Sequence, residues 1–588
     1  MNIFDVLSMI GGLCLFLFGM ETMGDGLTRT SGSRLESILA SLTSSVPRGV
    51  ALGCAVTAVI QSSSATTVML VGFVNSGIMK LRQAIPVIMG ANIGTTATAW
   101  ILSLSSIDGN SVFIKLLKPM SFSPILAAVA IMFIMFSKNE KKHNIGLTLI
   151  GFVVLMYGMN IMSSAVSPLK DVPEFVNILT MFQNPILGVA AGAVITATIQ
   201  SSSASVGILQ ALCMTGTITY GTAIPIIMGQ NIGTCVTAIL SAIGANKGAK
   251  RVAAVHLSFN IIGTVVLLAL FYIVNAFVGF DFIKEVANPA DIALIHSIFN
   301  IAATAMLLPF YKQLEKLAMI FVKDAPEKKA KDETLLLLDE RFLEAPSFAT
   351  AKCLEVSHKM ANHSKECIFE ALRLIDNYSE ERISHVNALE EKIDRYEDAL
   401  GEYIVRLERQ DLNSDDNNTL SMILHNIGDF ERISDHAKNI GEVASELHRK
   451  NLKFSAEASK EVKVFVDAVK EAIDLAIDSY VQGDVNRSQS VEPLEDVIDG
   501  INDEVKMRHI QRLQKGKCTI ELGFILSDLA TNLERVADHC SNIAACTIET
   551  NKDEFGLHKY VRGIKKYDMG VYADREKFYR GKYSLPIN

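Results

Sequence analysis

Two short clusters of amide and hydroxyl side chains interrupt apolar stretches of the chain and suit the binding of an anion. They are Gln61, Ser62, Ser63 and Ser64, and Gln200, Ser201, Ser202 and Ser203. Serine favours the position before a helix, and the apolar run that follows each cluster indicates one. We therefore expect each cluster at the N-terminus of a half-helix. Free N–H groups, hydroxyls and the helix dipole attract an oxyanion such as phosphate there.

The clusters have two interpretations, because polar residues inside an apolar segment must line a cavity or pack against protein. In the first, the glutamine amides bond the anion or offer a carbonyl oxygen to a cation. In the second, the serines only join neighbouring helices by hydrogen bonds. Binding is favoured because both clusters occupy the same register of an internal repeat.

A second pair of motifs, G-A-N-I-G-T-T and G-Q-N-I-G-T-C, follows Pro86 and Pro225. A helix broken there would present carbonyl and hydroxyl oxygens to Na⁺. The alternative is a tight glycine-mediated crossing of two helices with a polar cap. The candidate residues are Asn92, Thr95, Thr96, Asn231 and Thr234, and Cys235 replaces the last threonine of the first copy.

A third pair of motifs has the form H-x-x-x-N, at His256 and Asn260 and again at His296 and Asn300. The spacing puts each pair on one helix face. Hydrogen bonding between helices is the simpler interpretation, and a substrate or gating role is the alternative.

The first two kinds of motif recur at a constant offset: Gln61 and Gln200, like Asn92 and Asn231, are 139 residues apart. No gap is needed over about 85 residues, so this half of the chain is an internal duplication. If each Q-S-S-S stretch is a re-entrant hairpin and the N-terminus faces out, the basic loops fall on the cytoplasmic side, with Lys115 and Lys118 as exceptions. Each copy then crosses three times, which inverts the second copy. Broken segments in inverted repeats are typical of secondary transporters.

The distribution of charge separates two halves of the chain. Met1–Ile320 contains 17 Lys and Arg and 12 Asp and Glu residues, and the other 268 residues hold 38 and 51. This excludes a purely soluble enzyme and a disordered chain, and it argues against a nucleic-acid partner. The nine cysteines have no metal or disulfide spacing. No Ser–His–Asp arrangement emerges, so we expect no enzyme. Apolar runs long enough to span a bilayer are expected near Ile3–Met20, Leu81–Leu104, Met120–Phe136, Ile145–Met162, Tyr220–Ile243, Val252–Val278 and Ile292–Ile320.

The charged half has a helical pattern with turn signals that suggest about six helices. E-R-I-S-D-H-A-K-N at Glu431 and E-R-V-A-D-H-C-S-N at Glu534 form a second repeat, 103 residues apart. It indicates two three-helix bundles. Two carboxylates one turn apart repel unless a cation or a basic group lies between them. The alternative is a solvated or arginine-paired acidic face.

The paired Q-S-S-S and G-x-N-I-G-T motifs over roughly Met1–Ile320 resemble the bacterial branch of the type II sodium–phosphate cotransporter family. The resemblance implies an all-α, polytopic membrane transporter of two inverted repeats with re-entrant helical hairpins. It implies Na⁺-driven symport of inorganic phosphate across the plasma membrane, by alternating access around a midplane site. Both Q-S-S-S clusters would lie at the phosphate and sodium sites. A phosphate exporter and a non-transporting phosphate sensor are the alternatives.

The E-x-x-x-D helices are similar to those of the PhoU family, which bind metal clusters. This likeness implies a metal site at Glu431, Asp435, Glu534 and Asp538, with the metal undefined, and a regulatory cytoplasmic domain. Its partner would be a second copy of the chain or a regulatory protein. We therefore expect a membrane transport domain at 1–320, with repeats at about 3–136 and 145–279. A linker at 321–346, a PhoU-like pair of three-helix bundles at 347–550 and a polar tail at 551–588 follow.

Overall fold

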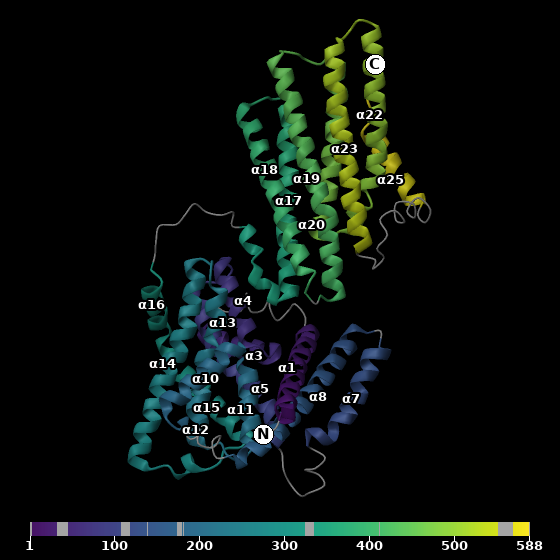
Figure 1. The fold of residues 1–588 in the computed structure, drawn as a ribbon. Coiled ribbons are helices and arrows are strands. Elements are labelled where there is room, and N and C mark those ends of the chain that lie inside the picture. Colours follow the sequence, from purple (N-terminus) through teal and green to yellow (C-terminus); the bar gives the residue numbers. More distant parts are fainter. Residues whose placement is uncertain are drawn as a thin grey trace. The chain divides into compact units, whose positions relative to one another are not determined.

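Helices form wherever the apolar or amphipathic pattern predicts them. The computed structural model describes residues 3–31, 45–106, 118–137, 139–172, 179, 181–323, 334–410, 412–550 and 569–586. Within these ranges the chain is helical, and an isolated bridge from Thr219 to Val286 is its only β pairing. The chain divides into two compact units, Met1–Phe348 and Ala349–Asn588 (Figure 1).

The N-terminal unit contains seven apolar segments long enough to cross a membrane, one at each expected span. Five are longer than expected, and the spans that begin at Leu81 and Tyr220 end one and two residues earlier. They comprise α1 (Ile3–Ser31), α5 (Leu81–Ser103), α7 (Pro119–Phe136), α8 (Glu140–Val166) with the 3-10 turn Ser167–Asp171, α12 (Tyr220–Gly233) with α13 (Cys235–Ser241), α14 (Lys247–Val278), and α15 (Pro289–Leu307) with Leu308–Phe310 and α16 (Tyr311–Phe321). Further short 3-10 turns cover Leu104–Ser106 and Asp281–Lys284.

Four shorter apolar helices form two hairpins around the Q-S-S-S clusters. They are α3 (Val46–Ile60) with α4 (Ser63–Asn75), and α10 (Pro185–Ile199) with α11 (Ser202–Cys213). At about 1.5 Å per residue none of them spans the roughly 30 Å of a hydrocarbon core, as expected of re-entrant segments.

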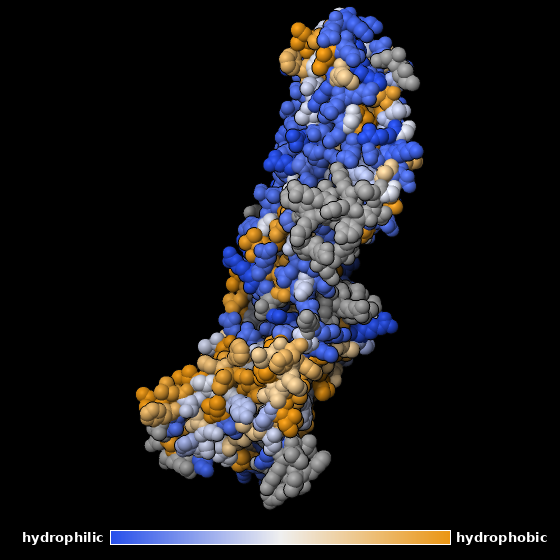
Figure 2. All heavy atoms as spheres, turned by 90° about the vertical axis from the view of Figure 1, so that its right-hand side faces the viewer, coloured by the Kyte–Doolittle hydropathy of each residue, from blue (hydrophilic) through white to orange (hydrophobic). Residues whose placement is uncertain are grey.

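The surface of each unit matches the solvent that its composition predicts. Large apolar side chains such as Ile125, Phe136 and Phe277 are exposed on the N-terminal unit. Figure 2 shows hydrophobic side chains gathered over this unit and hydrophilic ones over the other. Apolar surface on this scale is stable against lipid and unstable against water, so the N-terminal unit is a multi-pass membrane domain.

The crossing of α1 and α8 shows the relation between the two copies. Gly12 faces Met162, Gly19 faces Leu155 and Gly26 faces Thr148, so the two helices run antiparallel. Gly158 is the equivalent of Gly19, which makes α8 the counterpart of α1. Two equivalent helices that run antiparallel belong to copies of opposite orientation, and the predicted inverted repeat is confirmed.

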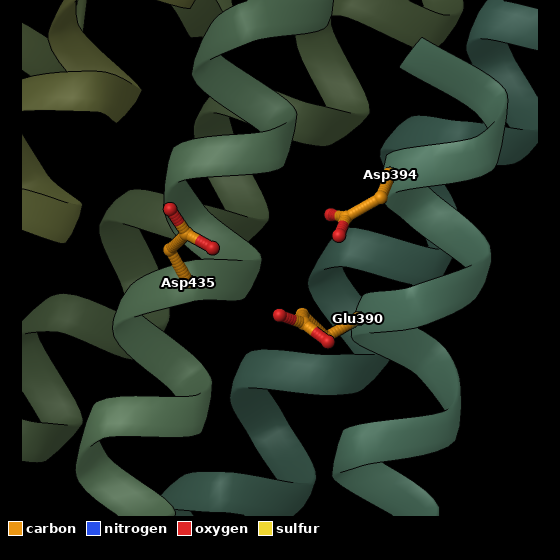
Figure 3. A group of neighbouring side chains, drawn as sticks. All are labelled: Glu390, Asp394 and Asp435. Carbon is orange, nitrogen blue, oxygen red and sulfur yellow. The ribbon is translucent and has the colours of Figure 1, made fainter. Parts of the chain in front are cut away.

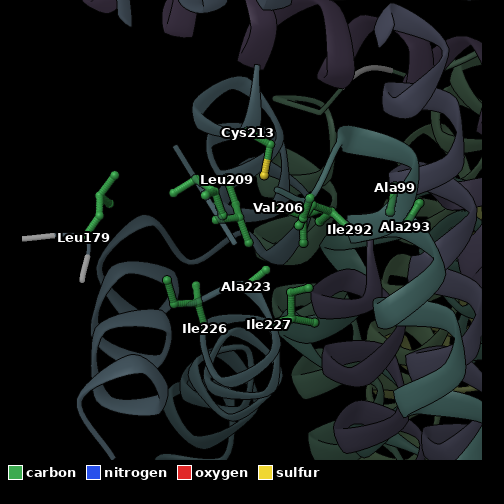
Figure 4. Close-up of a cluster of buried hydrophobic side chains, with 12 residues drawn as sticks. Ala99, Leu179, Val206, Leu209, Cys213, Ala223, Ile226, Ile227, Ile292 and Ala293 are labelled. Atoms are coloured by element: carbon green, nitrogen blue, oxygen red, sulfur yellow. The ribbon is translucent and has the colours of Figure 1, made fainter. Parts of the chain in front are cut away.

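The copies also interlock through their second half-helices. On α11, Val206 and Leu209 pack in an apolar cluster with Ala99 of α5 and Ile292 of α15 (Figure 4). The half-helix α4 of the first copy packs in turn against α13 and α14 of the second. Each Q-S-S-S half-helix therefore contacts elements of the other copy.

The C-terminal unit is built from long amphipathic helices in two sets of three, as the second repeat predicts. The first set is α17 (Pro346–Leu374), α18 (Glu380–Leu407) and α19 (Ser414–Arg449). The second is α20 (Ala456–Gln482), α22 (Val491–Gln514) and α23 (Ile520–Thr550), with the short α21 (Val485–Ser488) between its members. Within the expected polar tail, α25 (Met569–Lys582) packs on α22, and Tyr572 donates to Asp496 at 2.5 Å.

Candidate functional site

Each Q-S-S-S cluster forms the turn between two half-helices. α3 ends at Ile60, and the next residue, Gln61, has a left-handed backbone with φ 59°. Gln200 has φ 58° after α10. Of the three described non-glycine residues with positive φ, two are these glutamines. The conformation costs about 1–2 kcal/mol, so the surrounding contacts must hold it.

The serine after each glutamine caps the second half-helix, as the sequence predicts. Ser62 Oγ accepts from the N–H of Ala65 at 3.1 Å, and Ser201 Oγ accepts from that of Ala204 at 3.2 Å. Other backbone N–H groups of the first turn have no helical acceptor. Both half-helices thus begin with hydroxyls and N–H donors suited to an oxyanion.

The arms of each hairpin are joined by a hydroxyl pair that the sequence reasoning missed. Thr57 Oγ1 donates to Thr66 Oγ1 at 3.0 Å in the first copy, and Thr196 Oγ1 donates to Ser205 Oγ at 2.8 Å in the second. Both pairs are buried and obey the offset of 139, which was the available signal.

The two glutamines differ in their surroundings. Gln61 is 7% exposed, accepts from Thr98 Oγ1 at 2.8 Å and donates to the carbonyl of Ala58. Gln200 is exposed. Among the described residues, no hydrogen bond joins Gln61–Ser64 to Gln200–Ser203 directly. They are connected through α5, because Thr98 bonds Gln61 and the neighbouring Ala99 packs against α11.

The glycines of the second motif allow two helices to touch at backbone distance. A Cβ on Gly90 would lie 2.0 Å from the carbonyl oxygen of Val50, and one on Gly229 would lie 2.1 Å from that of Val189. This supports the glycine-mediated crossing that the sequence left open.

The predicted break of the helix at this motif is wrong for the first copy. α5 runs continuously from Leu81 to Ser103, and the hydroxyls of Thr95 and Thr96 bond carbonyls of their own helix. α12 and α13 meet at Thr234, whose backbone stays helical at φ −59° and ψ −25°. Carbonyls that keep helical partners are poor cation ligands, so the amides of Asn92 and Asn231 are the better candidates here.

These two asparagines have different bonding. Asn231 Nδ2 donates to the carbonyl of Ile227 at 2.9 Å. Asn92 is 3% exposed, and its Nδ2 has no hydrogen-bond partner among the residues that the structure describes. A buried unpaired donor costs about 1–3 kcal/mol, which favours a ligand or water beside Asn92.

The H-x-x-x-N motifs pack against the two copies in parallel ways. Asn260 Nδ2 donates to Cys235 Sγ at 3.3 Å, which supports hydrogen bonding between helices. One turn beyond each asparagine, Thr264 donates to the carbonyl of Met228, and Thr304 donates to that of Met89. The two carbonyls are equivalent, so α14 bonds α12 in the second copy in the same way that α15 bonds α5 in the first.

In the C-terminal unit, acidic side chains gather between neighbouring helices. Glu390 and Asp394 of α18 meet Asp435 of α19, and the three point toward one another in Figure 3. Glu495, Asp499 and Asp538 form the second group, between α22 and α23. In each group, one carboxylate oxygen from each of the three residues lies within 4.8 Å of the other two.

The groups include Asp435 and Asp538 from the sequence motif, but not Glu431 and Glu534. Burial and the neighbouring Asp435 raise the pKa of Glu431, and burial and Asp538 raise that of Glu534. The sequence reasoning missed the carboxylates of α18 and α22, because contacts between helices follow no fixed spacing along the chain.

The two acidic groups are not equally suited to a cation. Lys438 Nζ bonds Glu390 Oε1 at 2.7 Å and neutralises part of the first group. The second group has Ser541 in the equivalent place, 103 residues on. Burial and then Asp499 raise the pKa of Glu495 to about 8. Mutual repulsion of this kind is relieved by a divalent cation, so the second group fits one better.

The histidines beside the motif join the two bundles. His436 Nδ1 pairs with Asn532 Oδ1 at 2.8 Å, and His539 Nδ1 pairs with Asp429 Oδ1 at 2.8 Å. Their rings lie 5.6 Å apart. They thus serve the packing of the two sets of helices.

Comparisons with known proteins agree with this arrangement. A family model described as Na⁺/Pi-cotransporter matches twice, at residues 15–164 and 154–285, and the PhoU domain model matches at 358–444 and 463–547. Each double match confirms one internal repeat.

Individual relatives cover different parts of the chain. The "Putative inorganic phosphate export protein YjbB" of Escherichia coli is 23% identical over 94% of this chain and 99% of its own. The "Sodium-dependent phosphate transport protein 2A" of Rattus norvegicus is 35% identical over 98 residues, 16% of this chain and 15% of its own. The crystal structure of PhoU from Pseudomonas aeruginosa is 19% identical and covers 36% of this chain and all of its own, with a TM-score of 0.33.

Proposed function

We propose that this chain, which belongs to the Na⁺/Pi-cotransporter family and carries a C-terminal PhoU domain, moves inorganic phosphate across the membrane together with Na⁺. Phosphate would bind at the two Q-S-S-S turns, and the copies would rock around that site. The PhoU domain, on the cytoplasmic side, would regulate the movement.

One observation carries the proposal: both copies hold a glutamine in a left-handed turn before a serine-capped half-helix. Strain repeated at equivalent positions marks a functional site. The opposite orientation of the copies would let the two half-helices approach the site from opposite faces. The burial of Gln61 and exposure of Gln200 support a site that opens to one side at a time.

Dependence on Na⁺ rests on neutral oxygens and on the relatives. Na⁺ takes oxygen ligands, and Gln61, Gln200, Asn92 and Asn231 offer amide oxygens near the hydroxyls. The rat relative is named for sodium-dependent transport, over the matched segment only. Few carboxylates lie in the spans, so coupling to protons through buried acids has less support.

The test is labelled-phosphate uptake into proteoliposomes of the purified full chain, with an inward Na⁺ gradient against a matched K⁺ gradient. We expect accumulation above equilibrium with Na⁺ alone. Phosphate binding without flux under either cation would refute transport and favour a sensor.

Export is the second candidate, because relatives that match nearly the full length are named putative phosphate export proteins. Symport is reversible, so its direction follows the gradients. Vesicles loaded with phosphate should release it faster when the Na⁺ gradient is directed outward. Release at the same rate with Na⁺ or K⁺ would indicate an exporter without Na⁺ coupling.

We further propose that Glu495, Asp499 and Asp538 bind a divalent cation in the PhoU domain. Each group has an arginine on its motif aspartate, Arg432 on Asp435 at 3.5 Å and Arg535 on Asp538 at 3.3 Å. The first group has Lys438 in addition, so the lower positive charge beside the second group and the raised pKa of Glu495 support the second site. The bound ion would neutralise the carboxylates, and this chain's residues would supply the oxygen ligands.

Glu495→Gln is expected to stabilise the metal-free protein at alkaline pH. The pKa of Glu495 is raised from 4.5 to about 8, so the folded state keeps a proton that the unfolded state releases. Stability is therefore lost as the pH rises through this window. In chelator at pH 8.5 we expect Glu495→Gln to unfold several degrees above the wild type, with little difference at pH 5.

Thermal unfolding with and without Mn²⁺ completes this test. The ion should raise the wild-type midpoint at pH 8.5 and raise that of Glu495→Gln less. Glu442→Gln, at an exposed carboxylate of α19, is the control and should match the wild type. Equal midpoints for all three proteins in chelator would contradict the prediction.

A further inference from the structure

A short segment after the last membrane span packs against the Q-S-S-S hairpin of the first copy. It includes the 3-10 helix Glu340–Glu344 and follows another at Leu335–Leu337. Phe342 is fully buried beside Phe73 of α4, with ring centroids 5.5 Å apart, and Phe348 lies 4.9 Å from Phe73. A Cβ on Gly72 would come within 2.7 Å of the Phe342 ring. The segment is therefore fitted to α4.

Hydrogen bonds extend this contact from the first copy to the second. Asp339 Oδ2 accepts from Asn75 Nδ2, at the C-terminus of α4, at 2.6 Å. Asn75 in turn accepts two hydrogen bonds from Asn246, the residue before α14. Its Oδ1 accepts from the backbone N–H of Asn246 and its carbonyl oxygen accepts from Nδ2, both at 2.8 Å. Arg341 holds Asp339 in an ion pair at 2.8 Å and donates from Nε to the carbonyl of Ser241, at the end of α13, at 2.7 Å.

The bridged elements lie at one end of the membrane unit. Arg82 bonds Tyr311 there, and Arg251 bonds the carbonyl of Val322. The copies must separate at this end if they rock to open the site toward it. The contacts of Asp339, Arg341 and Phe342 would then break or move.

We propose that Asp339–Phe348, here called the latch, keeps this end closed, and that the PhoU domain controls transport through it. The control of transport rests on the proposed function, while the closure is argued from the contacts of the latch with both copies. Asp339 and Phe342 are positioning residues that act on the site through α4. The last three residues of the latch, 346–348, form the start of α17, the first helix of the PhoU domain.

Two variants release the latch in different ways. Asp339→Ala removes the bond to Asn75 and the partner of Arg341. Gly72→Ala pushes the Phe342 ring away, and it is mild for the helix because Ala211 occupies the equivalent position in the second copy. Glu344→Ala, at an exposed carboxylate of the latch, is the matched control.

The full chain is measured in two ways. Hydrogen–deuterium exchange should be on the order of tenfold faster in α4 and the start of α14 for both variants, as expected on loss of a charged hydrogen bond. Labelled-phosphate flux should rise severalfold, with Glu344→Ala at wild-type values in both measurements. The double variant Asp339→Ala/Asn75→Ala should exceed Asp339→Ala by less than the effect of Asn75→Ala alone, because the two changes share the bond between Asn75 and Asp339.

Unchanged exchange in α4 would overturn the latch, whether or not the protein transports phosphate. Faster exchange with unchanged flux, or with lost flux in folded protein, would overturn its control of transport. If the wild type moves no phosphate while exchange responds as expected, the proposed function fails and the closure stands.

Discussion

Gln61→Ala and Ser201→Ala are each expected to reduce phosphate flux to background while leaving folded protein. Gln61 joins the left-handed turn to Thr98 of α5, and Ser201 caps α11. The loss of a cap costs about 0.5–2 kcal/mol, too little to unfold a packed membrane domain. The loss of flux would therefore report the anion site, measured by labelled-phosphate uptake in proteoliposomes.

Asn184→Ala is the matched control for Ser201→Ala. Asn184 caps α10, in the same hairpin but at the opposite end of a half-helix, by accepting from the N–H groups of Ile186 and Leu187. The Asn184→Ala variant loses a capping energy similar to that of Ser201→Ala, and it should keep most of the phosphate flux. Near-normal flux in both Gln61→Ala and Ser201→Ala would remove the basis for the site.

Gly19→Ala is expected to disrupt the membrane domain, whereas Gly11→Ala on the same helix is harmless. A Cβ on Gly19 would lie 2.2 Å from the backbone nitrogen of Leu155, and one on Gly11 would meet nothing within 4 Å. Alanine favours a helix by about 1 kcal/mol over glycine. Forced separation of α1 and α8 should outweigh this gain and cost about 3 kcal/mol or more.

Thermal unfolding and size-exclusion chromatography in detergent test this pair. Gly19→Ala should unfold at a lower temperature or aggregate, and Gly11→Ala should equal or exceed the wild type. Equal midpoints for both variants would mean that α1 and α8 are not held at backbone distance.

The sequence predicted the features that local rules and the repeats encode. The capped starts of α4 and α11 follow from serine before an apolar run, and the inverted copies follow from the offset of 139. Local chemistry does not say which helix lies opposite. For that reason the acidic partners of Asp435 and Asp538 were not predicted, although Glu431 and Glu534, one turn away on the same helices, were named.

Two further differences between the sequence predictions and the structure also arise from packing between helices. The G-x-N-I-G-T motif suggested an interrupted helix, but α5 stays continuous because its glycines lie against α3 and need no distortion of their own. The unequal burial of Gln61 and Gln200 arises from surroundings that differ between two nearly identical motifs, so no comparison of the motifs reveals it.

The antiparallel crossing of α1 and α8 has a consequence for the ancestry of the fold. Gly19 of α1 meets α8, while its counterpart Gly158 meets α1 at Phe16. The same surface thus occurs on both sides, as in an isologous interface between identical subunits. A half-length ancestor could have built this contact as a symmetric dimer. Fusion then freed each half to diverge, as Ala91 and Gln230 or Thr96 and Cys235 have done.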